Sequence, residues 1–219
     1  MPFPFQALYL PLAMVIALVA WWRARSLGGA FLRWSGVLVL AALAVELWAL
    51  MLRWRWGHNT WLYNVFTPIE FLLMLRLAAC HLPQHRIALL VSAAVGLAGM
   101  ALAFVRASST DILLVEGVVL MAVIITGWSL AALWNIAQRV DRPLAASPSF
   151  WFFLGVLLYF CGIVPFVSML YLLDHDDPQL TNALYWIVIV LAILRYLLAA
   201  FAFGMARRQR QWDEHGRRA

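Results

Sequence analysis

Lysine is absent from this chain of 219 residues, and charged residues of every kind make up only 12% of it. Soluble domains carry about 25% charged and roughly 45–50% apolar residues, whereas 65% of this chain is hydrophobic and its mean hydropathy is +0.86. So little polar surface cannot cover a folded chain in water, which excludes soluble enzymes, disordered tails and secreted disulfide scaffolds. We therefore expect an integral membrane protein whose main partner is the lipid bilayer.

Recognisable catalytic and cofactor motifs are lacking as well. No Ser/His/Asp set or glycine-rich phosphate loop occurs, and without lysine a retinal Schiff base is excluded. No two spans carry axial haem histidines at matching depth. Cys80 and Cys161 fall in separate apolar segments, where they are expected to pack as small hydrophobic residues. His81 and His85 are separated by Pro83 and are interpreted as an interfacial pair. The sequence predicts no catalytic residue, no metal site and no particular cofactor.

Apolar runs of about 20 residues are long enough to cross the hydrocarbon core. Seven such runs are predicted, at residues 5–22, 31–52, 61–80, 87–105, 112–135, 150–173 and 182–205. We expect an all-α polytopic bundle with one transmembrane domain over residues 1–206 and a basic tail over 207–219. No connector is long enough to hold a soluble domain.

The arginines are distributed unevenly between the two ends of the predicted spans. One side holds Arg23, Arg25, Arg33, Arg86, Arg139, Arg142, Arg207, Arg208, Arg210, Arg217 and Arg218, and the other holds Arg53, Arg55 and Arg106. Because basic residues concentrate on the cytoplasmic side, we predict an N-terminus outside and a cytoplasmic C-terminus. The net charge of +6 is interpreted as topology and anionic-lipid contact, not as nucleic-acid binding.

Ionisable side chains inside the spans are costly, and they usually mark a functional site. Glu46 and Glu116 are predicted to lie roughly 8–9 Å from the outer ends of their spans, and Glu70 about 14 Å. Asn64 and Thr67 accompany Glu70, and Pro68 interrupts the same helix. The expectation is a ligand-binding pocket formed by Glu46, Asn64, Thr67, Glu70 and Glu116, open to the outside and suited to a cation, an amine or another small protonatable ligand. The alternative for Glu46 and Glu116 is a protonated carboxyl that only fixes helix register.

The mouth of this pocket is predicted to carry His58, Asn59, Tyr63, Asn182 and Tyr185. Arg195, in the seventh span, allows two interpretations. Its guanidinium can extend to the inner headgroups, or it can form a cross-helix ion pair with Glu70 that acts as a switch.

Small residues mark two predicted packing seams. Ser92, Gly96, Gly99 and Ala103 lie on one face of the fourth span. Gly155 and Gly162 lie seven residues apart in the sixth span, with Tyr159 between them on the same face.

The segments Trp61–Phe71 and Pro148–Trp151, with Gly155, Tyr159 and Phe160, are similar to the seven-helix membrane regions that precede sensor histidine kinases in some Bacteroidetes-type bacteria, and to stand-alone relatives. This resemblance implies a receptor-like input bundle in a bacterial inner membrane. It also implies output through a separate cytoplasmic signalling protein.

Three functions are therefore considered. The first is a membrane sensor or binding protein that signals through its cytoplasmic end. The second is a small proton- or cation-coupled transporter that uses Glu70. The third, an intramembrane enzyme, is disfavoured because no nucleophile–base set is visible.

Overall fold

The computed structural model describes residues 8–56, 59–107, 114–139, 143–173 and 178–216. Within these residues, seven helices are long and apolar enough to cross a membrane. They are α1 (Tyr9–Ala24), α2 (Ala30–Trp56), α3 (Thr60–His81), α4 (Arg86–Arg106), α5 (Val115–Arg139), α6 (Pro148–Leu173) and α7 (Pro178–Gly216). The predicted all-α seven-helix bundle is confirmed.

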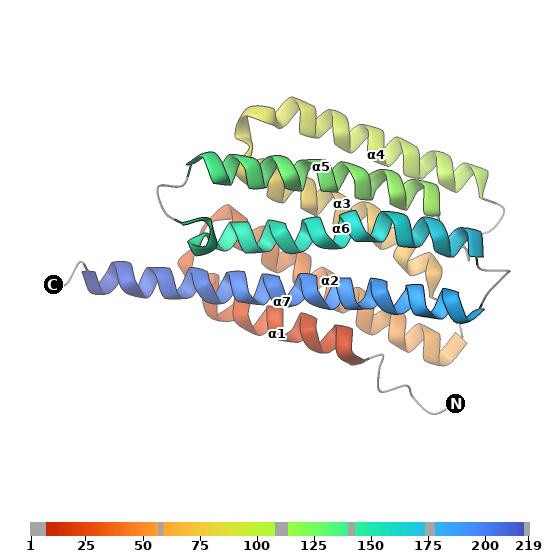
Figure 1. The fold of residues 1–219 in the computed structure, drawn as a ribbon, viewed down its shortest axis with the longest axis horizontal. Helices are drawn as coiled ribbons and strands as arrows, with labels where there is room; N and C mark the ends of the chain where they lie inside the picture. The colour runs from red at the N-terminus through yellow and green to blue at the C-terminus, as the bar shows by residue number, and fades with distance from the viewer. Residues whose placement is uncertain (1–7, 57–58, 108–113, 140–142, 174–177, 217–219) are drawn as a thin grey trace.

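Helices form because a bilayer core offers no water to satisfy backbone N–H and C=O groups, so each span must bond internally. The connections are short and include the 3₁₀ turns Arg25–Leu27, Pro83–His85 and Leu144–Ala146. Short connections bring consecutive helices side by side and antiparallel, with the start of α1 and the end of α7 at opposite ends of the bundle (Figure 1).

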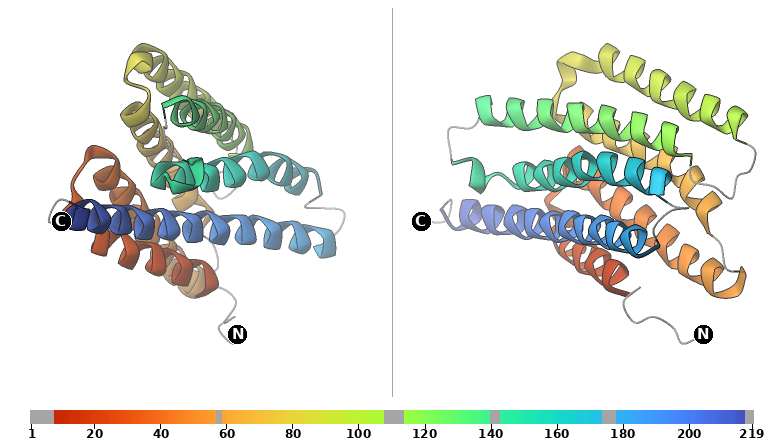
Figure 2. Two further views of the ribbon diagram at one scale, coloured as in Figure 1. Left: turned by 60° about the vertical axis from the view of Figure 1, so that its left-hand side comes forward. Right: turned by 45° about the vertical axis from the view of Figure 1, so that its right-hand side comes forward.

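Six of the helices form a closed ring. Around it, α1 packs on α2, α2 on α3, α3 on α5, α5 on α6, α6 on α7, and α7 on α1. The remaining helix, α4, packs against α3 and α5 at the edge of the bundle (Figures 1 and 2). In this ring α3 and α7 occupy opposite positions, so a side-chain contact between them crosses the interior.

The α7 helix is the longest of the seven, with 39 residues. At a rise of 1.5 Å per residue it is about 58 Å long, and Figure 1 shows it extending beyond the other helices toward the C-terminus. Its membrane-spanning part covers Leu184–Gln209. The predicted boundary at residue 206 therefore does not coincide with a structural break, because the basic tail continues the same helix as far as Gly216.

Both predicted small-residue seams are packing contacts. A side chain at Gly96 would meet the ring of Phe71 on α3, and one at Gly99 would meet Leu120 on α5. The Trp128 indole on α5 donates to Ser92 Oγ at 3.0 Å. On α6, Gly155 lies directly against the α7 backbone, where a Cβ would be 3.2 Å from the Arg195 carbonyl oxygen and 3.1 Å from Leu198 Cβ.

Gly155→Leu should lower the free energy of unfolding by about 1–3 kcal/mol, because overpacked side chains force neighbouring groups apart and the Arg195 backbone cannot rotate away. The matched control is Gly127→Leu on α5, where an added Cβ meets nothing within 4 Å. Unfolding in detergent, followed by tryptophan fluorescence, measures both variants. Equal stability of the two would contradict the close approach of α6 to α7.

Candidate functional site

A polar cluster occupies the interior of the helix ring near the middle of the spans. We call it the central polar cluster and define it as Glu46 on α2, Tyr63 and Glu70 on α3, Tyr159 on α6, and Arg195 and Tyr196 on α7. Four helices thus contribute to one site. Apart from Tyr63 and Glu70 on α3 and the adjacent Arg195 and Tyr196 on α7, these side chains are far apart in the sequence, and the packing of the ring brings them together.

The ion pair between Arg195 and Glu70 is the centre of this cluster. Arg195 Nη2 lies 2.7 Å from Glu70 Oε1, and the two side chains are only 4% and 14% exposed. The sequence allowed Arg195 either to extend to the headgroups or to pair with Glu70, and in the structure it pairs with Glu70. The sequence-based depths of Glu70 and Arg195 differ by about 6 Å, and the long arginine side chain spans that difference.

Three aromatic rings enclose the guanidinium of Arg195. Its central carbon lies 5.0 Å from the ring centres of Tyr159 and Phe160 and 5.3 Å from that of Tyr196. A cation held over aromatic faces in a desolvated site gains about 2 kcal/mol per favourable contact. The three rings therefore stabilise the positive charge of Arg195, together with Glu70, and they cover the guanidinium.

Glu46 belongs to the same cluster through Tyr63. The Tyr63 hydroxyl donates to Glu46 Oε2 at 3.0 Å, which joins α3 to α2. Tyr63 lies within range of electrostatic interaction with Tyr159 and Tyr185, and Tyr159 within range of Glu46, Glu70 and Arg195. Tyr63 and Glu70 are seven residues apart and share one face of α3, so the Glu46–Tyr63 pair lies about 10 Å nearer the beginning of that helix.

Glu116 does not join the other two carboxylates, which corrects the prediction of a three-carboxylate pocket. It lies in the first turn of α5 and is 77% exposed, with Arg106 Nη1 at 3.9 Å from its Oε2. The apolar residues before Val115 were counted as part of the span, but α5 begins only at Val115 among the described residues. Glu116 is therefore at the end of the helix and not two turns inside.

Asn64 and Thr67 are both engaged in backbone hydrogen bonds. Asn64 is 1% exposed, and its Oδ1 accepts from the N–H of Leu114 at 3.1 Å, immediately before α5. The Thr67 hydroxyl donates to the Tyr63 carbonyl at 2.8 Å within α3. Both contacts hold the backbone around the cluster, and a role in ligand binding stays a prediction.

The predicted mouth residues are dispersed. Asn59 donates to the Ala49 carbonyl at 3.2 Å and so ties the start of α3 to α2. Tyr185 is about half exposed on α7. His58 and the side chain of Asn182 lie outside the described residues. Tyr63 is partly buried in the first turn of α3 and donates to Glu46, so it belongs to the central polar cluster. Its place at the mouth of a pocket stays a prediction.

The aromatic enclosure of Arg195 is the part of the site that sequence reasoning missed. The sequence places Tyr159 on a packing face between Gly155 and Gly162, Phe160 enters only through the family resemblance, and Tyr196 is not among the predicted site residues. The available signal was the adjacency of Tyr196 to a charged residue inside a span. The close contact of Gly155 with α7 brings Tyr159, one turn further along α6, over the guanidinium.

Comparison of the chain with protein-family models, with curated proteins and with solved structures gives no match. The fold and the site together define a seven-helix membrane protein with a buried ion pair that crosses the helix ring.

Glu70→Met and Arg195→Met should each lower the free energy of unfolding by about 3–5 kcal/mol, because removing one partner leaves a buried charge uncompensated. The double variant Glu70→Met/Arg195→Met should be destabilised by much less than the sum. The control is Arg55→Gln, which removes an exposed arginine near the end of α2 and should change stability by less than about 0.5 kcal/mol. Additive effects in a double-mutant cycle would show that the two charges do not interact.

Proposed function

We propose that this protein is a membrane sensor in which a cationic ligand competes with Arg195 for the carboxylates of the central polar cluster. The observation that carries the proposal is the Glu70–Arg195 ion pair, which joins α3 to α7 across the ring. A ligand that binds Glu70 releases Arg195, and with it the helix that leads to the C-terminal end. A conformational change needs such a difference in interaction between two states.

The composition of the cluster favours a cation or a protonated amine. It holds two carboxylates, Glu46 and Glu70, and one guanidinium, Arg195. With both carboxylates ionised, one negative charge is left without a cationic partner inside the cluster. Tyrosine rings around the site add faces that attract organic ammonium groups. Glu46 and Tyr63, nearer the beginning of α3, are the first groups that a ligand arriving from that end meets.

The α7 helix provides the output. It runs without a break from Pro178, through Arg195, to Gly216, so a shift at Arg195 moves the basic end of the chain as one rigid element. The excess of arginines at that end supports a cytoplasmic C-terminus. The resemblance noted above supports a bacterial inner membrane and a separate signalling protein as the receiver. The arginine-rich end of α7 is the surface we assign to that partner.

Small organic ammonium ions should raise the melting temperature of the purified protein in a saturable way, by about 5 °C near saturation. Glu46→Gln and Glu70→Gln should abolish the rise, because each removes a carboxylate that the cation needs. The matched control, Glu116→Gln, should retain it, since Glu116 lies apart from the cluster. Equal stabilisation of all three variants, or none of the wild type by any ammonium ion, would contradict a cation-binding cluster.

Spin labels at Gln84, after α3, and at Gly216, at the end of α7, report the switch. In the full chain in nanodiscs, Glu70→Gln and Arg195→Gln should shift the distance distribution between the labels by about 1–2 Å or more, the usual scale of helix displacements. Arg55→Gln, at the exposed end of α2, should leave the distribution unchanged. If the neutralised variants also match the wild type, the ion pair stabilises the bundle without controlling α7.

A transporter is the second candidate, and the prolines favour it. Pro68 lies inside α3 and Pro165 inside α6. Each proline lacks an N–H and so leaves one backbone carbonyl of its helix without the usual partner, and free backbone carbonyls are a feature of transport sites in several membrane-protein folds. Ammonium flux into proteoliposomes that depends on Glu70 would support transport. Binding without flux would support the sensor.

A further inference from the structure

A groove lined by arginines lies at the other end of the bundle, away from the central polar cluster. It is formed between α1 and α7 by Ala20, Arg23, Gly204, Arg207 and Arg208, with a cavity volume of about 280 Å³. We call it the arginine groove. We propose that it binds the phosphate headgroup of an anionic phospholipid in the leaflet that faces the C-terminal end of the bundle.

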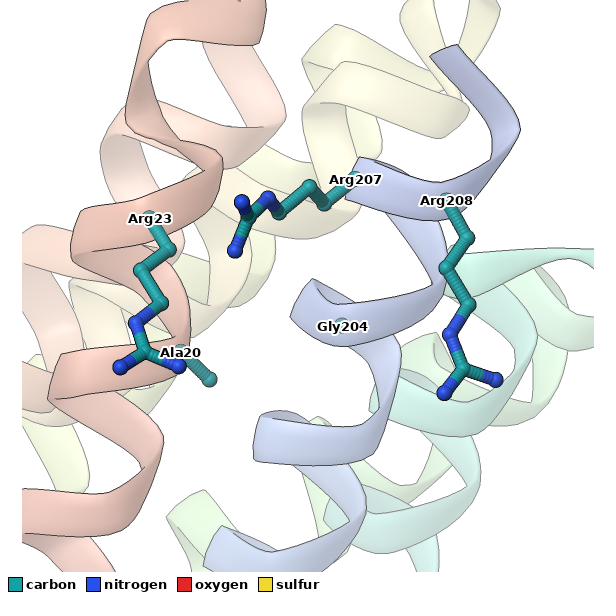
Figure 3. Close-up of a pocket in the computed structure, with 5 residues that line it drawn as sticks. All are labelled: Ala20, Arg23, Gly204, Arg207 and Arg208. Carbon is teal, nitrogen blue, oxygen red and sulfur yellow. The ribbon is translucent and has the colours of Figure 1, made fainter. Parts of the chain in front are cut away.

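The side chains in the arginine groove are arranged to receive a group from the membrane side. Figure 3 shows Arg207 extending from α7 toward α1, while the guanidinium of Arg23 runs back along α1 to the level of Ala20. Arg208 runs back along the opposite side of α7, to about the level of Gly204 (Figure 3). Two of the three cationic groups therefore point toward the middle of the spans and not out of their ends.

The small residues provide the space. A Cβ built on Gly204 would meet nothing within 4 Å, so the α7 wall of the groove is open at this position, and Ala20 occupies little room on α1. A larger side chain at either position would fill the space between Arg23 and Arg207.

Among the side chains that the structure describes, no acidic group is paired with the arginines of the groove. Within the part of the chain that the structure describes, the ion pairs are Arg106–Glu116 and Arg195–Glu70, and neither involves Arg23, Arg207 or Arg208. The neighbouring Arg25, by contrast, lies over the Trp22 ring at 3.2 Å from its centre. The exposed guanidinium groups of Arg23 and Arg207 thus face one space between α1 and α7, with Arg208 adding positive charge from the other side of α7 (Figure 3). This arrangement favours an anion, and a phosphate oxygen would accept charge-assisted hydrogen bonds from the two arginines.

The position of the arginine groove favours a lipid over a soluble phosphate. The membrane-spanning segments end at Leu27 on α1 and at Gln209 on α7, so Arg23 and Arg207 lie within the last turns of their spans, at the level of the headgroups. About two to three turns deeper, Ile16 on α1 and Leu197 on α7 are exposed apolar residues. These side chains suit acyl chains that descend from a headgroup held between the helices, in the manner of basic interhelical pockets for anionic lipids.

The test uses the full chain in nanodiscs of phosphatidylcholine with increasing fractions of phosphatidylglycerol or cardiolipin. Native mass spectrometry counts the retained anionic lipid, and the melting temperature gives an apparent affinity. Arg23→Gln and Arg207→Gln should each weaken retention about fivefold, and the double variant about 25-fold. The matched control is Arg33→Gln, which removes an exposed arginine from α2 at the same end of the bundle and should bind like the wild type.

Gly204→Leu separates the groove from general surface charge, because it fills the space and keeps every arginine. It should reduce retention at least fivefold without lowering the melting temperature in pure phosphatidylcholine. If inorganic phosphate stabilises the protein as much as the lipids do, the groove binds a soluble phosphate and the lipid proposal is wrong. Retention that falls equally in Arg33→Gln, or that is unchanged in Gly204→Leu, would overturn the proposal.

Discussion

A guanidinium in the middle of a bilayer span is tolerated only when its charge is compensated, and in this protein Glu70 compensates Arg195. The pair joins two helices that lie opposite each other in the ring, so the same contact that neutralises the charge also holds the bundle together across its interior. Tyr159, Phe160 and Tyr196 surround the cation and remove it from lipid. Tyr63 lies on α3, one of the two paired helices, and its hydrogen bond to Glu46 adds α2 to the same arrangement.

The close approach of α6 to α7 serves this interaction. Gly155 allows contact with the backbone at Arg195 itself, which fixes the point along α7 from which the side chain must start. A bulky residue at position 155 would displace the origin of that side chain as well as loosen the seam. Packing by small residues and compensation of charge are therefore two parts of one arrangement, although the sequence presents them as separate features.

The α7 helix has arginines in two different environments, one in the interior of the bundle and one near its C-terminal end. Arg195 meets a carboxylate and aromatic rings in the interior, whereas Arg207 and Arg208 line an open groove at the headgroup level. Gly204 lies nine residues beyond Arg195, about 13 Å along the helix. A lipid held in the groove would join the end of α7 to α1, and the ion pair joins its middle to α3. Any movement of α7 must change one or both of these contacts.

Position along the sequence predicted some members of the site and misplaced others. Glu46 and Glu70 were recognisable because charged residues inside long apolar runs are rare. Glu116 looked equivalent, but apolar residues beside a span boundary do not have to belong to the helix, and it lies in the first turn of α5. For Arg195 the sequence left two orientations open, since depth alone does not tell whether a long flexible side chain turns inward or toward the headgroups.

Composition and run length by themselves determined that the protein is a bundle of seven membrane-spanning helices, because the bilayer requires about 20 apolar residues for each crossing and satisfied backbone groups along each one. Tertiary structure alone decided which helices face each other. That choice depends on side-chain packing at positions such as Gly155 and on the pairing of charges between distant spans. Neither the packing at such positions nor the charge pairing produces a periodic pattern of apolar and polar residues in a sequence that is apolar nearly throughout.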